Sequence, residues 1–570
     1  MNKAIGILAT VGCFALLVAG GASAQQYVAQ GFHKEFGVHQ FDPDHLTCLD
    51  EVHAAYDFDH DGKLEFFVLT DESQPNGPYD ELDDGACVYL YECTGKDTYE
   101  LIWAFRDTSL ATGGASFPTC CVTDMDGDGW HELLIGIPYG GGYPTPDGNP
   151  VRLYVFEGSP SGLPSWDSPT ATWNFEAKPG TNTRPAGMAA ADIDGDGVAE
   201  VACAFRNFSS ATKNDALMIF SLLGEFAGPF TQFKIEVMDT TTDVNSIYDA
   251  AITDIDNDGK LEALFPSYSK DLFVFYEGVG PDTYSYHTVA GGDMLWAAIH
   301  GTVNVDLDGD GKNEVVSGDN RGYFGFIGDV TDLATIGVDN LYQVGMASPN
   351  GTRGLTAGDY DGDGKADIFV GGNWSGKVFR IEYVGGDKAD STSYTWEMIY
   401  QYPPDTAEAR VYDVCFPGDN KNYWQTGNNL VHDMDGDGEP ELLIAHETGD
   451  ANTQDWLMII EGRGVTAVEI IPGAPVLKSF KLHQNYPNPF NPTTAIVYEM
   501  PRAEYVTVRI YDSTGRLVRT LQENKLQPAG SHELIWDATD DMGRSLPSGV
   551  YLCHVKMGSL SLTRNMILAR

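Results

Sequence analysis

The 570-residue chain has little positive charge and no long apolar run after its first two dozen residues. Lys and Arg number 34 against 83 Asp and Glu, which gives a formal net charge of −49. This charge argues against nucleic acid or an anionic membrane surface as a partner, because both are negative. No stretch after residue 24 approaches the ~20 apolar residues that a transmembrane helix needs. We therefore expect no transmembrane segment in the mature protein.

Common catalytic motifs are also missing from the sequence. It contains no Gly-x-Ser-x-Gly, no His-Glu-x-x-His and no Gly-rich phosphate loop before a helix. His131-Glu132 and His532-Glu533 each lack the second histidine of a zinc protease. Further histidines flank acidic loops, where a solvated or packed side chain is commoner than a general base: His53, His60 and His432. The motifs therefore give no catalytic residues, and we expect a protein that is not an enzyme.

The N-terminus predicts export. Lys3 precedes an apolar run over residues 4–18, and Ala22-Ser23-Ala24 follows as a cleavage site. These features predict a secretory signal peptide over residues 1–24 rather than a membrane anchor, because the run is short and lacks a basic stop-transfer flank. Cys13 lies too early in this run to be a convincing lipoprotein cysteine.

Cysteines are sparse. The mature chain keeps eight of the nine, without metal-type spacing. Export makes disulfides possible. Cys87 and Cys93 share one expected strand, and the neighbours Cys120 and Cys121 cannot face the same side. We expect buried cysteines or one or two bridges, whose pairing the sequence does not define.

What the sequence does contain is one acidic nine-residue frame, repeated seven times. Each copy has Asp at positions 1, 3 and 5, Gly at position 6 and an acid at position 9. Carboxylate oxygens in this compact arrangement suit Ca²⁺, which takes six to eight oxygen ligands. We number the copies loops 1 to 7. Their predicted metal ligands are Asp57, Asp59, Asp61 and Glu65; Asp124, Asp126, Asp128 and Glu132; Asp192, Asp194, Asp196 and Glu200; Asp254, Asp256, Asp258 and Glu262; Asp306, Asp308, Asp310 and Glu314; Asp359, Asp361, Asp363 and Asp367; Asp433, Asp435, Asp437 and Glu441.

The flanks of the loops predict strands. A short run of small or β-branched residues precedes each loop, as in 120–123 and 189–191, and a hydrophobic run follows it, as in 133–136. A third run often ends in Glu-Gly, as at 151–158 and 272–278, and a fourth precedes the next loop, as at 172–175. Short apolar and β-branched runs bounded by Gly, Pro and Asn are typical of strands. Loop starts recur every 52 to 74 residues, which indicates a repeat architecture.

Seven four-stranded units predict an all-β fold, namely a seven-bladed β-propeller over residues 25–470 with one calcium loop in each blade. Tandem nonapeptide rolls, type 3 repeats and dockerins also use Asp-rich loops, but they need closer spacing or amphipathic helices. An EF-hand would place its last acid at position 12 between helices, not at position 9 between strands.

Residues from about 45 to 465 resemble the FG-GAP/VCBS repeats of integrin α-chains and many bacterial surface proteins. The Asp-x-Asp-x-Asp-Gly-x-x-Glu/Asp loops match that family's calcium loops, and 134–138 resembles its hydrophobic-Gly-Ala-Pro strand. Only loop 6 departs, with the shorter Asp367 at position 9. The resemblance implies calcium in about seven structural sites, which would leave a net charge of about −35. Some polysaccharide lyases are calcium-loaded propellers of similar blades, so a lyase or hydrolase is the alternative to a binding protein.

The calcium loops, which join the first and second strands, are expected on one face of the propeller. The long variable connections lie on the opposite face, where relatives dock their ligands. Aromatic side chains there are suited to stack on sugars or to fill a partner's pocket, or else pack locally to hold the loops: Tyr79, Tyr139, Tyr143, Trp374, Tyr423 and Trp424.

Residues 471–477 are a linker by composition, and residues 478–570 are expected to form a small Ig-like β-sandwich. This region contains 11 Lys and Arg and 8 Asp and Glu, so its charge balance is slightly positive, whereas the rest of the chain is strongly acidic. This region resembles the type A C-terminal sorting domains of the type IX secretion system, and the resemblance rests on the stretches 485–494, 511–515, 536–540, 547–551 and 564–570. The alternative is an ordinary Ig-like module of the flagellar hook-cap type. Such a module explains the strands but not the Tyr-Pro-Asn-Pro-Phe-Asn-Pro opening. The resemblance implies the type IX machinery as a partner and delivery to the outside of a Gram-negative cell.

Together these observations predict a secreted, calcium-stabilised recognition protein for an extracellular glycan or protein. A structural subunit of an extracellular assembly is a third possibility. The sequence does not identify the ligand.

Overall fold

The computed structural model is all-β in the residues that it describes. These are 27–28, 33–38, 48–71, 87–106, 118–137, 151–158, 168–175, 183–209, 214–244, 246–267, 272–290, 301–318, 322–346, 351–372, 375–401, 410–417, 433–447, 457–461, 481–500, 504–527, 530–541, 543–557 and 560–569. Within them the only helical segments are short 3-10 turns: η1 (Gly228–Phe230), η2 (Leu333–Thr335), η3 (Val338–Asn340) and η4 (Ser391–Ser393). No helix in these ranges is long and apolar enough to cross a membrane.

Seven antiparallel sheets follow one another along residues 27–461. Sheet 1 contains β3 (Cys48–Tyr56), β4 (Glu65–Asp71), β5 (Cys87–Gly95) and β6 (Thr98–Arg106); sheet 2 contains β7 (Thr119–Thr123), β8 (Glu132–Gly136), β9 (Leu153–Glu157) and β10 (Ala171–Trp173); sheet 3 contains β11 (Arg184–Ala191), β12 (Glu200–Ser209), β13 (Asn214–Leu222) and β14 (Phe233–Asp239). Sheet 4 contains β15 (Ala251–Thr253), β16 (Glu262–Pro266), β17 (Leu272–Gly280) and β18 (Thr283–Ala290); sheet 5 contains β19 (Thr302–Val305), β20 (Glu314–Gly318), β21 (Tyr323–Ile327) and β22 (Leu341–Met346). Sheet 6 contains β23 (Thr352–Gly358), β24 (Asp367–Gly372), β25 (Lys377–Tyr383) and β26 (Tyr394–Gln401); sheet 7 contains β27 (Arg410–Cys415), β28 (Glu441–Glu447) and β29 (Leu457–Glu461).

Two strands from the N-terminal part of the chain complete the last two sheets. β1 (Tyr27–Val28) pairs with the outer strand β26 and makes sheet 6 five-stranded. β2 (His33–Val38) pairs antiparallel with β29 and becomes the fourth strand of sheet 7. The described N-terminal strands therefore join the end of the repeated region through backbone hydrogen bonds.

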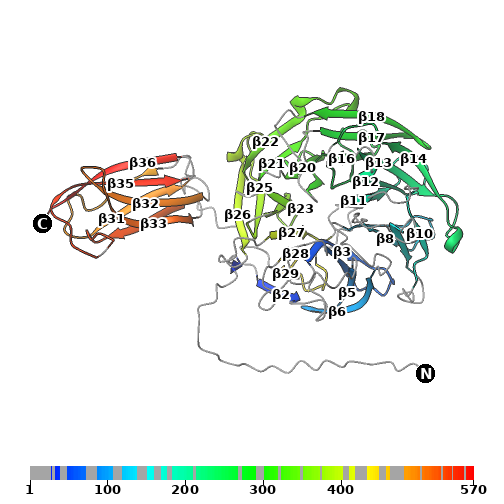
Figure 1. The fold of residues 1–570 in the computed structure, drawn as a ribbon, viewed down its shortest axis with the longest axis horizontal. Helices are drawn as coiled ribbons and strands as arrows, with labels where there is room; N and C mark the ends of the chain where they lie inside the picture. Colours follow the sequence, from blue (N-terminus) through cyan, green and yellow to red (C-terminus); the bar gives the residue numbers. More distant parts are fainter. Residues whose placement is uncertain are drawn as a thin grey trace, which may run out of the picture.

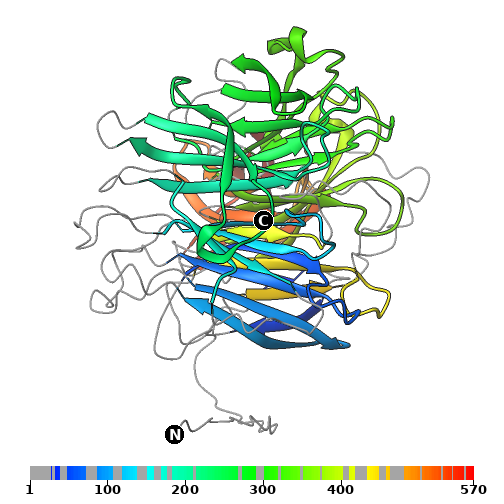
Figure 2. The same ribbon diagram turned by 90° about the vertical axis from the view of Figure 1, so that its right-hand side faces the viewer.

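Figure 1 shows the seven sheets fanned about a common centre, with β11, β23 and β27 towards the inside. In the view turned by 90° the strands run across the width of this body, so their connecting loops lie at its two faces (Figure 2). Sheet 1 contacts the sheets on both of its sides. The backbone N–H of Cys120 in sheet 2 donates to Oε2 of Glu51 at 3.2 Å, and the N–H of Asp97 donates to Oδ2 of Asp435 beside sheet 7 at 2.7 Å.

The first strands are rich in small side chains because neighbouring sheets crowd together there. Ala189, Ala190 and Ala191 of β11 are all buried. Side chains then alternate between the two faces of a strand. Cys120 and the adjacent Cys121, for example, pack into different hydrophobic clusters, one shared with sheet 1 and one shared with sheet 3. Both cysteines are buried, as are the others whose side chains are described: Cys93, Cys203, Cys415 and Cys553.

Residues 481–569 form two further sheets around a separate core. One contains β30 (Lys481–Leu482), β31 (Thr494–Met500) and β34 (Gly530–Trp536), and the other contains β33 (Leu517–Gln527), β32 (Glu504–Asp512), β35 (Gly549–Met557) and β36 (Leu560–Leu568). Trp536, which is fully buried, packs with Phe490 and Tyr551 in this core.

The proline-rich opening of this region is part of its core rather than a free linker. Asn485, 3% exposed, donates to the carbonyl of Pro487 and to Oγ1 of Thr494 at 3.1 and 2.8 Å. The side-chain oxygen of Asn488 accepts the backbone N–H of Ile567 in β36 at 2.9 Å. Backbone hydrogen bonds at 2.9 Å also join Phe490 to this last strand. Asn485 thus fixes the conformation of the Asn-Tyr-Pro-Asn-Pro-Phe-Asn-Pro motif, and Asn488 and Phe490 bind it to the other end of the region.

Candidate metal loops

Each acidic loop precedes the second strand of its sheet, and in sheets 1 to 6 it follows the first strand directly. The acid at position 9 is in every case the first residue of that second strand. Loops of neighbouring sheets also touch: the rings of His60 in loop 1 and Trp130 in loop 2 stack with centroids 3.9 Å apart, and Asn313 in loop 5 donates to Asn257 in loop 4. Loops 1 and 2 therefore lie side by side, as do loops 4 and 5.

All seven loops share three internal hydrogen bonds. The position 6 N–H donates to Oδ2 of the position 1 Asp at 2.7 to 3.2 Å. The N–H of position 5 donates to the position 3 Asp, and that of position 7 to the position 5 Asp. Position 6 has φ between +86° and +96°, which favours glycine because it has no Cβ. The repeated aspartates thus set the loop conformation, and each retains oxygen capacity for a further partner.

The acid at position 9 is buried in every loop, at 2% exposure or less. One of its oxygens accepts the backbone N–H of position 2, as in the bond from Met125 to Oε2 of Glu132 at 2.6 Å. In loops 1 to 4 the second oxygen, Oε1, is buried and has no hydrogen bond among the described residues: Glu65, Glu132, Glu200 and Glu262. A buried carboxylate oxygen without a partner is costly. It is therefore a position that a bound cation would satisfy.

The donor set and its spacing fit calcium. In loops 2, 3 and 4 one oxygen from each of the four acids lies within 4.8 Å of the others. Oxygens on opposite sides of a Ca²⁺ ion lie about 4.6–5.2 Å apart, since Ca–O distances are 2.3–2.6 Å. All the donors are hard oxygens, with no Cys or His among them, and Ca²⁺ prefers such ligands. The residues of these loops therefore fit a calcium ion.

Burial also shapes the acidity of the loops. Burial, together with the neighbouring aspartates, raises the pKa of Glu65 to about 8 and the pKa values of Glu132, Glu200 and Glu262 to about 9. The cause is that each carboxylate loses water and faces other negative groups. A divalent cation would reverse this effect by favouring the ionised form.

Several cations that the sequence pattern did not indicate also contact the loops. In loops 1, 4 and 6 the Lys at position 7 bridges the position 5 Asp and a Glu on the third strand, as Lys260 does with Asp258 and Glu277 at 2.6 Å each. These lysines are roughly half exposed, at 43% to 47%. The signals available in the sequence were Lys at position 7 and a Glu late in the third strand, which begins a Glu-Gly ending in sheet 4 only, of these three sheets. Arg380 and Lys388 were missed as well.

The aromatic residues predicted for the opposite face lie outside the described residues: Tyr79, Tyr139, Tyr143, Trp374, Tyr423 and Trp424. Their role as a ligand face stays a prediction. The predicted signal peptide over 1–24 also falls outside the described part of the chain.

Two family models match parts of the chain. The FG-GAP-like repeat matches residues 124–203, which contain loops 2 and 3, and the FlgD Ig-like domain matches residues 491–560. The first agrees with the resemblance of the acidic loops, and the second supports an Ig-like C-terminal region. No curated protein matches the sequence.

Three solved structures show a distant similarity to this chain. PorZ, an essential bacterial surface component of the type-IX secretion system of Porphyromonas gingivalis, is 14% identical over 91% of this chain and 59% of its own, with a TM-score of 0.35. This chain thus spans less than two thirds of PorZ. A rhamnogalacturonan lyase of Bacillus licheniformis is 15% identical over 77% of this chain and 75% of its own, with a TM-score of 0.39. A fungal alcohol oxidase is 12% identical over 96% and 100%, with a TM-score of 0.40.

Proposed function

We propose that the protein is a secreted, calcium-stabilised recognition protein built on a seven-bladed β-propeller, which binds a glycan or a protein outside the cell. The observation that carries the proposal is the sevenfold acidic loop at the start of each second strand, with a buried, unsatisfied carboxylate oxygen in four of the copies. Calcium bound there would stabilise the sheets and hold the loop face in one shape.

A closed ring is supported by the contacts of sheet 1 with sheets 2 and 7 and by the pairing of β2 with β29. In such a ring each sheet packs between two neighbours, and only short strand edges stay exposed. The face opposite the calcium loops would then carry the long connections, including the six aromatic residues predicted to meet a ligand.

For export, we propose a signal peptide over 1–24 and a type IX sorting domain over 478–570. The linker 471–477 would join the propeller to the sorting domain. The basis is the motif at 485–494, in which Asn488 accepts a hydrogen bond from the last strand, together with the match to an Ig-like domain over 491–560. The protein would then reach the surface of a Gram-negative cell or the medium, with the type IX secretion machinery as its partner.

The test uses the mature protein in 1 mM calcium with a panel of polysaccharides, followed by size-exclusion chromatography of the polymers. A polymer that elutes intact with the protein supports recognition and names the ligand class. A polymer that shortens overturns the binding proposal in favour of a lyase or hydrolase.

If no polymer changes its elution, the glycan branch of the proposal fails. Size-exclusion chromatography of the protein alone, over a series of protein concentrations, is then the next measurement. Concentration-dependent assembly would favour a structural subunit, and a monomer at all concentrations would leave a protein ligand. A variant with Tyr423 and Trp424 changed to Ala separates binding at the predicted face from binding elsewhere.

A further inference from the structure

Loops 5 and 6 differ from loops 1 to 4 at the acid of position 9. In loops 1 to 4 its second oxygen has no hydrogen-bond partner among the described residues. In loops 5 and 6 that oxygen is held by a side-chain cation: Lys388 contacts Oε1 of Glu314 at 3.0 Å, and Arg380 contacts Oδ1 of Asp367 at 2.7 Å. The other oxygen accepts the position 2 N–H in all six loops.

In loop 6, Arg380 extends from the third strand of the same sheet. Its Nε donates to Asp367, and its Nη2 donates to Oδ2 of Asp361 at position 3. The Arg380 side chain is only 10% exposed. Its guanidinium therefore lies among the oxygens that would surround a metal, where a second cation would meet both steric overlap and charge repulsion.

The strand register shows that this arginine is specific to sheet 6. Asp367 pairs with Glu382, and Arg380 stands two residues before Glu382 on the same face of β25. In each of the other sheets the residue two before the partner of position 9 is apolar and fully buried: Leu90, Val155, Ile219, Phe275, Phe326 and Ile459. The only arginine at this register thus accompanies the only Asp at position 9. A shorter acid leaves the room that the guanidinium occupies.

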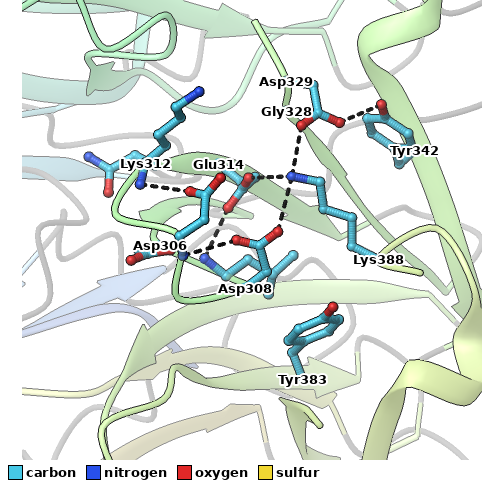
Figure 3. A network of polar contacts seen from close by, with 12 residues as sticks. Asp306, Asp308, Lys312, Glu314, Gly328, Asp329, Tyr342, Tyr383 and Lys388 are labelled. Carbon is cyan, nitrogen blue, oxygen red and sulfur yellow. Dashed lines mark hydrogen bonds and ion pairs between the residues drawn. The ribbon is translucent and has the colours of Figure 1, made fainter. Parts of the chain in front are cut away.

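In loop 5 the cation comes from the neighbouring sheet (Figure 3). Lys388, in the connection between β25 and β26, reaches Glu314 at position 9 and Oδ2 of Asp308 at position 3, the latter at 3.3 Å. A third carboxylate, Asp329, contacts the same Nζ at 2.9 Å and also accepts the hydroxyl of Tyr342 at 2.7 Å. The Lys388 side chain is 14% exposed. Three acids therefore hold the ammonium at loop 5, and Tyr342 positions one of them, Asp329.

Other connections between third and fourth strands reach position 3 in a different way. In loops 3 and 4 the backbone N–H groups of Asp282 and Leu333 donate to Oδ2 of Asp194 and Asp256. Neither brings a charge to position 9. A lysine close to a loop is also not sufficient, because Lys63 contacts Asp61 and Glu92 but not Glu65. Only loops 5 and 6, among those compared, have a side-chain cation on the position 9 oxygen.

We propose that loops 5 and 6 are not calcium sites, and that Lys388 and Arg380 take the place of the metal ion there. Loops 1 to 4 keep the open oxygen that calcium would bind. The inference rests on the proposed calcium role of the loops. Sheet 6 supplies both cations, so the seam between sheets 5 and 6 is held without metal.

The first experiment locates ions in crystals of the mature, full-length protein soaked with Tb³⁺, using anomalous scattering. We expect peaks in loops 1 to 4 and none in loops 5 and 6. A peak within either loop 5 or loop 6 overturns the inference while the proposed calcium scaffold stands. If loops 1 to 4 are also empty, the scaffold proposal fails instead. One oxygen in loop 6, Oδ1 of Asp359, has no hydrogen-bond partner among the described residues, so loop 6 is the more stringent test.

The second experiment counts calcium ions per molecule by native mass spectrometry. The double variant R380L/D367E gives loop 6 the residue types of the other sheets, and K388M removes the ammonium from loop 5. Each is expected to bind one ion more than the wild type. The matched control K63M removes a lysine that contacts loop 1 away from position 9 and is expected to leave the count unchanged. Folded variants whose count does not rise overturn the inference, and the wild-type crystal result decides it if a variant does not fold.

Discussion

The backbone N–H of Val52 in β3 donates to Oδ2 of Asp413 in β27 at 3.1 Å, across 361 residues of sequence. Both residues are fully buried, and their strands are the first strands of sheets 1 and 7. This hydrogen bond joins the beginning of the repeated region to its end. It is charge-assisted and shielded from water, which makes it stronger than an exposed bond.

The Asp413→Ala substitution is expected to destabilise the protein by about 1–3 kcal/mol, because it leaves the buried Val52 N–H without this acceptor. Asp413→Asn keeps an acceptor oxygen and should cost less. The midpoint of urea unfolding at 1 mM calcium measures both. Asp339→Ala, at an exposed position, is the control and should stay within about 0.5 kcal/mol of the wild type. Equal effects of the Asp413 and Asp339 variants would mean that the joint between sheets 1 and 7 contributes little.

Removal of calcium is expected to lower the stability markedly. At 1 mM calcium, a site with a Kd of roughly 10⁻⁴–10⁻³ M contributes about 0.4–1.4 kcal/mol to the free energy of unfolding. Loops 1 to 4, which have the open position 9 oxygen, would together contribute roughly 2–6 kcal/mol. Thermal unfolding with calcium and with chelator measures the difference. Magnesium is the control and should restore less, because it demands octahedral geometry at shorter distances. Identical curves with and without calcium would contradict a structural role for the ion.

A pair of matched substitutions separates a metal-binding glutamate from one bound by lysine. Glu132→Gln retains a carbonyl oxygen for the Met125 N–H but replaces the open Oε1 by the amide NH2 group, which donates hydrogen bonds and does not coordinate calcium. It should reduce the stabilisation by calcium by about 0.4–1.4 kcal/mol, the contribution of one site. Glu314→Gln should leave the calcium-dependent part unchanged, because Lys388 already occupies that oxygen. Thermal unfolding of both variants with and without calcium gives the comparison, and a similar loss in both would argue that loop 5 binds metal.

The local elements of the fold could be predicted because their signals are local. The loop frame and its flanking apolar runs identify the first and second strands, and the Glu-Gly ending identifies the third, as at Glu157-Gly158 after β9. The fourth strand of sheet 7 could not be predicted from the repeat, because it is β2, from the other end of the chain. Pairing over such distances depends on how the whole set of sheets packs.

The same limit applies to the candidate site. In loops 2, 3 and 4 the predicted acids come together as four-residue clusters because they lie within nine residues of one another. Lys388 reaches loop 5 from 74 residues away in sequence and from another sheet, so no spacing rule indicates it. Loop 6 did carry a visible sign, since Asp367 departs from the glutamate of the other copies. Its meaning became clear only once the register placed Arg380 beside it.

The hairpin turn after β32 gives a pH-dependent prediction. A hydrogen bond from the Thr514 hydroxyl, with further bonds from the backbone N–H groups of Thr514 and Arg516, lowers the pKa of Asp512 to about 2 from a usual value of 3.8. A depressed pKa means that this carboxylate stabilises the fold above pH ~4 and that the contribution is lost as the pH falls towards 2. Carbon-13 NMR titration of labelled segment 478–570 measures the pKa. Thr514→Val should move it upward, and a wild-type value near 3.8 would show that the turn does not favour the ionised form.

Gly278, which follows Glu277 in the third strand of sheet 4, is placed where a side chain would meet loop 3 of the neighbouring sheet. A Cβ at this position would lie 2.1 Å from the carbonyl oxygen of Ile193 and 2.6 Å from Cα of Asp194. Gly278→Ala must therefore displace backbone that holds a predicted calcium ligand, and we expect a loss of about 1–3 kcal/mol and weaker calcium binding. Calcium titration followed by thermal unfolding measures both effects. Gly549→Ala, where a Cβ meets nothing within 4 Å, is the control and should change neither. If Gly278→Ala lowers the stability equally with and without calcium, the contact serves packing alone. If the substitution mainly removes the calcium-dependent part of the stability, the Glu-Gly ending of the third strand positions the metal loop of the neighbouring sheet.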